Sequence, residues 1–131
     1  MPKFDKHRIK ELKELLFNSN AGNTHDAIIE SFQYEYGEGR LKVETFHPFY
    51  WARLSFTFHD IEILLATKGC WHGSCETILG LTVSEDLSYL QNCLSRYRED
   101  IEDSLYFMFQ TFSGNELHIV CREVSIEIEK Q

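Results

Sequence analysis

The sequence predicts an α+β protein, in which an N-terminal helix and one further helix pack on an antiparallel β-sheet. Three observations lead to this prediction. The chain opens with an amphipathic helical pattern, several later runs alternate apolar and polar residues with a period of two, and short glycine-containing turns join these runs. A strongly curled sheet or partial barrel made of the same strands is the alternative arrangement.

Length and composition place the chain among globular proteins. Its 131 residues are a common size for one domain, so we expect a single domain over residues 1–131. With 43% hydrophobic and 26% charged residues, it is too apolar for a disordered chain and too polar for a membrane protein. The first 17 residues lack the apolar core of a signal peptide, which predicts a cytoplasmic protein with reduced cysteines.

Residues 5–17 have the pattern of a helix. Asp5 stands where an N-cap is expected, and the turn-forming run Asn18–Asp26 ends the helix. Lysine and glutamate lie on the polar face of this helix. Its apolar face consists of Ile9, Leu12, Leu15 and Leu16.

Four strand patterns follow between residues 28 and 65. Glu30 is the one charged residue on the apolar face of the first run, and the turns predicted at Gly37–Gly39 and His59-Asp60 separate neighbouring runs. The positions expected on one face are Ile28, Phe32, Tyr34 and Tyr36, then Leu41, Val43 and Thr45, then Leu54, Phe56 and Phe58, and finally Ile61, Ile63 and Leu65.

The second half of the chain predicts a strand, a helix and a closing hairpin. A short strand is expected over 78–83, and Ser84 is placed to cap the second helix. Residues 105–112 are apolar on both faces, which is typical of a central strand. The apolar face of the helix would consist of Leu87, Leu90, Leu94 and Tyr97.

The last strands carry two further signals. In Ser113-Gly114-Asn115, the glycine is placed for a type II′ turn. Beyond it the apolar phase slips, because residues 117, 119 and 121 are odd whereas 124, 126 and 128 are even. Since strand side chains alternate with a period of two, this slip predicts a bulge or bend near Arg122–Glu123.

The charge distribution disfavours one class of partner. The net charge is −8: residues 1–14 carry a net +2 and the rest of the chain a net −10. An acidic body repels phosphate backbones, so nucleic acid is not an expected partner, and neither is a membrane. Acidity suits a basic protein partner, although it also serves solubility alone.

Catalytic and metal-binding patterns are weak. The spacing Cys70-Trp71-His72-Gly73-Ser74-Cys75 offers three zinc ligands, with His118 or Cys121 as a fourth, but has no second matched pair. No nucleophile elbow, phosphate-binding loop or zinc-protease motif is present in the sequence. We therefore expect neither an enzyme nor a cofactor or metal.

Two segments suit a protein-binding surface. The first is the aromatic connection 46–51, from which Phe49, Tyr50 and Trp51 are expected to bind a partner together with Trp71. The alternative is that the rings of this connection fold back to cap the sheet. The second is the acidic run 99–103, from which Asp100, Glu102 and Asp103 are expected to contribute.

Four stretches of the chain share features with one family. They are His25-Asp26 at the start of a strand with Phe32 and Tyr34, the strand Leu41–Thr45, the L-x-F-x-F-x-D-I-E run Leu54–Glu62, and the hairpin Phe107–Cys121. In these stretches the chain resembles small bacterial immunity proteins of polymorphic and contact-dependent toxin systems. Such proteins bind and block a cognate toxin. The resemblance implies this function here, but it assigns no site residues.

We therefore expect an immunity protein that occludes a cognate toxin domain, with a basic nuclease as the favoured toxin. Its acidic groups would oppose the positive surface that a nuclease uses for phosphates. The alternatives are a small-ligand or metal-binding module built on the Cys70–Cys75 loop, or a structural subunit of a larger assembly.

Overall fold

The computed structural model describes residues 2–19, 22–67, 76–85 and 104–130. Short 3-10 turns at Lys6–Arg8 and Tyr36–Glu38 accompany one α-helix and seven strands in this part of the chain. The elements in chain order are β1 (Lys3–Phe4), α1 (Ile9–Phe17), β2 (Ile28–Glu35), β3 (Arg40–His47), β4 (Ala52–Thr67), β5 (Glu76–Ser84), β6 (Leu105–Thr111) and β7 (Glu116–Lys130).

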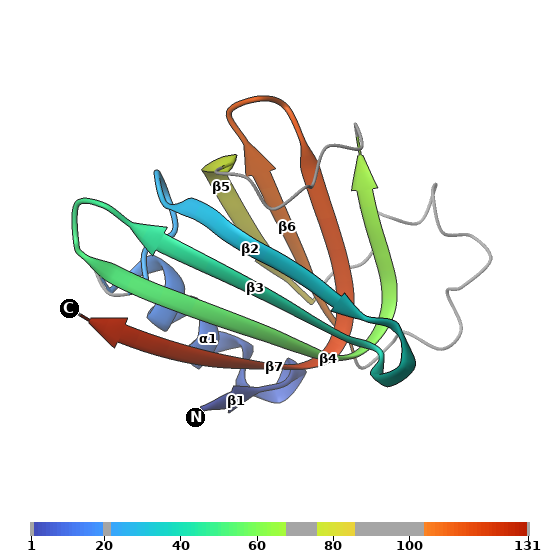
Figure 1. The fold of residues 1–131 in the computed structure, drawn as a ribbon. Helices are drawn as coiled ribbons and strands as arrows, with labels where there is room; N and C mark the ends of the chain where they lie inside the picture. Colours follow the sequence, from blue (N-terminus) through green and yellow to red (C-terminus); the bar gives the residue numbers. More distant parts are fainter. Residues whose placement is uncertain (1, 20–21, 68–75, 86–103, 131) are drawn as a thin grey trace.

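All strand pairs are antiparallel, and the sheet curls on itself (Figure 1). The strand order is β1-β7-β4-β3-β2-β5-β6, and β6 also pairs with β7. Because of this extra pairing, the strands from β2 to β7 form a closed ring. The pairing between β2 and β5 is short, since it consists of Ile28 with Thr77 and Ile29 with Glu76. The predicted antiparallel sheet is therefore confirmed, in the strongly curled form.

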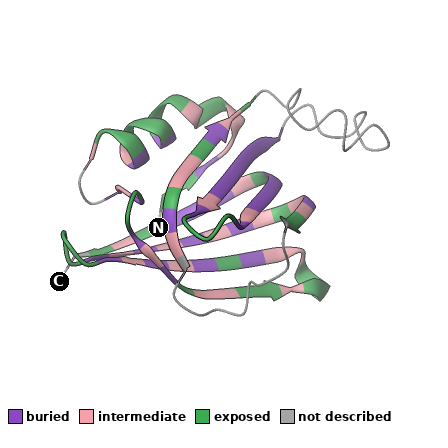
Figure 2. Cartoon of the chain, turned by 90° about the horizontal axis from the view of Figure 1, so that it is seen from above, coloured by how far each residue is buried: buried purple, intermediate pink, exposed green. Residues whose placement is uncertain are grey.

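The N-terminal helix is confirmed over most of its predicted length. The carboxylate of Asp5 caps the first turn by accepting a hydrogen bond from the backbone N–H of His7 at 3.0 Å. Leu12 and Leu16 are buried in the core, and Figure 2 shows the helix lying across the curled sheet. The described part of the chain contains no helix long and apolar enough to span a bilayer. Most of the second predicted helix falls in 86–103, outside the described residues.

Phenylalanine rings from β4 and β6 fill the centre of the core. Phe58 meets Phe107 with ring centroids 4.9 Å apart, and Phe56 meets Phe109 at 5.5 Å, both edge to face. Edge-to-face contacts between aromatic rings add to the stabilisation that their burial provides. The prediction of a central strand is confirmed, because β6 is almost wholly buried and pairs with both β5 and β7.

The predicted turn at His59-Asp60 is wrong, because β4 runs through it as one strand. Asp60 has φ 53°, and the β4–β7 register shifts between Ile61 and Ile63, so that Glu62 is an extra residue. A break in alternation fits a turn or a bulge equally well, and here it is a bulge. The carboxylate of Glu62 accepts hydrogen bonds from Ser104 at 2.7 Å and Arg122 at 3.0 Å.

The apolar phase slip in β7 is real, although the register shift lies in its partner strand. Cys121 and Val124 both belong to the core, and β7 passes between them as one strand. Figure 1 shows β4 and β7 bending together. The predicted bulge at Arg122–Glu123 is wrong, since the extra residue is in β4.

Two smaller predictions also need correction. In β2 the register shifts between Ile29 and Ser31, so Ile29 rather than Ile28 enters the core, and Tyr36 is exposed in the turn. In the β6–β7 turn, the N–H of Gly114 donates to the carbonyl of Thr111 at 3.0 Å, and Gly114 itself has φ 91°. This is a three-residue loop with a glycine bulge, not a type II′ turn.

Gly22 gives a test of the packing between α1 and the loop that follows it. A Cβ atom at Gly22 would lie 1.9 Å from the carbonyl oxygen of Leu15, which is backbone and cannot move aside. We expect Gly22→Ala to lower the free energy of unfolding by about 1–3 kcal/mol, as overpacking does. Urea unfolding measures this loss. Gly37→Ala is the control, because its Cβ would meet nothing within 4 Å; equal stability of the two variants would contradict the packing.

Candidate functional site

The connection between β3 and β4 exposes three aromatic side chains that follow one another in the chain. We call Phe46, Phe49, Tyr50 and Trp51 the aromatic corner. Phe49 is 82% exposed, Trp51 59% and Tyr50 36%. Exposed aromatic side chains that lie close together are typical anchors of protein interfaces.

The aromatic corner divides between the two faces of the sheet. Phe46 points to the outer face, where the ring of Trp51 packs edge-on against it at 5.6 Å between centroids. His47 points inward and is buried, and the ring of Tyr50 lies 4.5 Å from it. Tyr50 thus packs back against the sheet, as the capping alternative predicts, whereas Phe49 and Trp51 remain largely exposed.

His47 fixes the turn to the loop before β2. Its Nδ1 accepts a hydrogen bond from the N–H of Phe49 at 3.2 Å, so Nε2 carries the proton that is donated to the carbonyl of His25 at 2.8 Å. In addition, the hydroxyl of Thr45 donates to the carbonyl of Leu54 across the hairpin at 3.2 Å. The aromatic corner is thus held in place by polar contacts on its inner side.

Trp51 has an unfavourable backbone conformation. Its φ is 47°, in the left-handed region that bulky residues rarely adopt. Such a conformation costs about 1–3 kcal/mol and is found preferentially at functional sites. Glycine or asparagine would relieve the strain, so the tryptophan at this position is not explained by the turn itself.

Carboxylates surround Arg53 on the outer face beside Phe46. The Arg53 guanidinium lies 5.6 Å from the Phe46 ring centroid and donates to Glu30 at 3.0 Å. The register places Glu129 opposite Arg53, and Glu44 and Glu127 on either side of Ser55. The pKa of Arg53 is raised, first by the hydrogen bond to Glu30 and then by the charges of Glu30, Glu129 and Glu44.

Basic groups gather at the other end of the same face. Lys3, Arg40, Lys42 and His59 line a hollow of about 350 Å³. Its lysines and arginine have carboxylate partners: Arg40 pairs with Glu35 and Glu38 at 2.6 Å, Lys42 with Glu44 at 3.5 Å and Lys3 with Glu123 at 3.7 Å. The hydrogen bond from Arg40 lowers the pKa of Glu35. These charges largely compensate one another.

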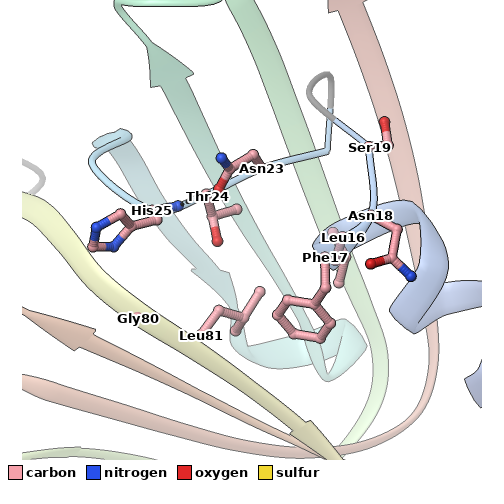
Figure 3. A pocket seen from close by; sticks show the side chains of 9 residues that line it. All are labelled: Leu16, Phe17, Asn18, Ser19, Asn23, Thr24, His25, Gly80 and Leu81. Atoms are coloured by element: carbon pink, nitrogen blue, oxygen red, sulfur yellow. Dashed lines mark hydrogen bonds between the residues drawn. The ribbon is translucent and has the colours of Figure 1, made fainter.

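A groove of about 430 Å³ lies between the end of α1, the following loop and β5 (Figure 3). Leu81 and Phe17 form its floor, and its polar groups are Asn18, Ser19, Asn23, Thr24 and His25. The Nδ1 of His25 donates to the carbonyl of Leu79 at 2.7 Å, at the point where the β5–β6 register shifts. The groove can take a small uncharged ligand, but it brings together no nucleophile and base.

A buried polar chain on β6 and β7 is the arrangement that most resembles a catalytic one. The Tyr106 hydroxyl lies 2.7 Å from Nδ1 of His118, and Nε2 of His118 lies 3.2 Å from Glu116. Tyr106 and His118 are only 2% and 5% exposed, so a substrate has no access to them. Both ring nitrogens of His118 are engaged, which argues against the zinc-ligand role considered from the sequence.

The described residues contain no group of three potential metal ligands. Burial raises the pKa of the Cys121 thiol far above its ordinary value, which makes it a poor ligand and nucleophile. The loop Cys70–Cys75 with Trp71, and the acidic residues Asp100, Glu102 and Asp103, lie outside the described residues.

Sequence reasoning identified the aromatic turn but missed the residues beside it. Arg53, Glu127 and Glu129 occupy polar positions of alternating strands, and the sequence assigned no role to them. Their proximity follows from the pairing of Arg53 with Phe46 and Glu129, which joins segments far apart in the chain. The usable signal was that glutamates recur every second residue at 127 and 129.

Comparison with known protein families found no family that matches the chain, and comparison with curated proteins found no match either.

Proposed function

We propose that the protein is an immunity protein that binds a cognate toxin domain through the aromatic corner and blocks it by occlusion. The observation that carries the proposal is Trp51, a bulky side chain that is 59% exposed at a strained φ of 47°. Strain retained at an exposed aromatic residue favours a role in binding, because the fold alone would be better served by glycine.

The charge of the protein supports a basic partner. The net charge is −8, and three glutamates (Glu30, Glu44 and Glu129) act on Arg53 beside the aromatic corner. A nuclease-type toxin carries positive charge where it binds phosphates, so an acidic inhibitor would both attract it and cover that surface. This complementarity is the reason for favouring a nuclease over other toxins.

A small-ligand module is the second candidate, and the groove beside His25 is the observation that favours it. Its uncharged polar rim and its floor of Leu81 and Phe17 are common features of ligand sites. The Cys70–Cys75 loop, which the sequence suggested for this role, lies outside the described residues.

Trp51→Gly separates binding from folding. Glycine relieves the backbone strain but loses the contact with Phe46, so we expect the free energy of unfolding to change by no more than about 1 kcal/mol. Binding to the toxin domain encoded next to the protein's own gene should weaken by more than about 2 kcal/mol, as at a central aromatic anchor. Calorimetry and urea unfolding measure the two quantities.

Tyr36→Ala is the matched control for this experiment. Tyr36 is 86% exposed in the β2–β3 turn, away from the aromatic corner, and its loss should leave binding unchanged. If Trp51→Gly binds the neighbouring toxin domain as tightly as the wild type, the aromatic corner is not the interface. If the wild type does not bind that domain, the immunity proposal fails.

Charge reversal in the acidic run tests electrostatic steering. Asp100→Lys, Glu102→Lys and Asp103→Lys together should slow association about tenfold while changing dissociation little, because long-range attraction acts on encounter. The effect on the association rate should shrink at high salt, because the distance over which charges act falls from about 8 Å at physiological ionic strength to about 3 Å at 1 M salt. Stopped-flow kinetics at two salt concentrations measure both rates. An association rate indifferent to salt and to reversal would leave the charge as a solubility feature.

Gly80→Leu tests the groove. A Cβ atom at Gly80 meets nothing within 4 Å, so leucine should close the groove without unfolding the protein. A thermal-shift screen with small uncharged metabolites should, for the second candidate, find a compound that stabilises the wild type but not Gly80→Leu. Equal stabilisation of both proteins would place the compound elsewhere, and a screen without any stabilising compound would count against a ligand module.

A further inference from the structure

Two carboxylates of the outer face stand on either side of a small residue. Glu44, Ser55 and Glu127 lie side by side on β3, β4 and β7. Adjacent strands are about 4.8 Å apart, so the backbones of Glu44 and Glu127 are about 10 Å apart, with only a serine between them. Residues paired across strands project to the same face. We call the space over Ser55, between these two carboxylates, the notch.

The next row of the sheet adds rings of the aromatic corner and a third carboxylate. Phe46, Arg53 and Glu129 pair across the same three strands, and Trp51 packs on Phe46 at 5.6 Å. Arg53 is already paired with Glu30, whereas Glu127 and Glu129 have no ion-pair partner among the described side chains. Lys42 lies 3.5 Å from Glu44, and an exposed ion pair of this kind contributes little free energy. Negative charge is therefore in excess here.

Arg53 demonstrates the kind of group that this surface accepts. Its guanidinium lies over Phe46 and donates to Glu30, so one planar cation uses a ring and a carboxylate together. The exposed ring of Trp51, which packs on Phe46, and the carboxylates of Glu127 and Glu129 are groups of the same two kinds on the same face. An ammonium group lacks the planar fork that uses both contacts well.

We infer that the partner presents an arginine-bearing segment, whose guanidinium enters the notch over Ser55 between Glu44 and Glu127, beside the aromatic corner. This inference rests on the proposed function, because it names the chemistry of the partner at the same surface. It predicts a preference for arginine over lysine, which a general attraction between opposite charges does not give.

Nona-arginine and nona-lysine peptides are suitable probes, titrated at physiological salt and followed by calorimetry and by the NMR signal of the Trp51 indole. We expect nona-arginine to bind about threefold more tightly than nona-lysine and to shift the indole signal. Glu127→Gln with Glu129→Gln should weaken nona-arginine binding about tenfold. Glu11→Gln with Glu14→Gln removes the same charge on α1 and should weaken it less than about twofold.

A further variant fills the notch instead of removing its charges. Ser55→Arg places a guanidinium between the two carboxylates and should abolish the preference for arginine even if the glutamine variants prove unstable. Equal losses in the two glutamine pairs, or equal affinity for the two peptides, would overturn the inference. Should the neighbouring toxin domain bind the wild type and Glu127→Gln/Glu129→Gln equally while Trp51→Gly weakens it, the proposed function would stand and the arginine inference would not. Should nona-arginine bind as expected while that toxin domain does not bind at all, the immunity proposal alone would fail.

Discussion

The pairing of the two long strands β4 and β7 is the constraint on which the rest of the structure depends. Their ladder runs from Ala52 opposite Lys130 to Thr67 opposite Glu116. Both strands supply the core on either side of Asp60, with Phe58 beside Val124 and then Ile61 beside Cys121. A strict alternation would turn the core residues on one side of Asp60 toward solvent. The left-handed Asp60 and the extra residue Glu62 prevent this, and they let the sheet curl around its main core.

The same ladder determines where the aromatic corner lies. Ala52 pairs with His47 on one side and with Lys130 on the other, so the beginning of β4 is fixed by two neighbours. The turn 48–51 has little freedom once both strands are placed, and the hydrogen bond from His47 to the His25 carbonyl restrains it further. An aromatic group that is ordered before it meets a partner loses less conformational entropy on binding.

Local patterns predicted the helix, most strands and the aromatic turn, because these depend on residues close in sequence. The errors occurred where a local break has two explanations. The break at His59-Asp60 fits a turn or a bulge, and only the continued pairing with β7 decides between them. Glu30 in β2 was such a break as well, and there it marks the change of phase that buries Ile29. The carboxylates near Arg53 were unpredictable for a different reason, since their proximity depends on the register between β4 and β7.

Strand order also constrains how the chain can fold. Among the described strands β1 pairs with β7 alone, through Lys3 with Ser125 and Phe4 with Val124, and β7 also pairs with β4 and β6. More than 100 residues separate the members of the first pair. During synthesis, β1 and β4 are therefore made before β7, the strand with which they pair. Contacts of such long sequence separation slow folding, so the unpaired edges of β4 and β1 are exposed to other chains during that interval.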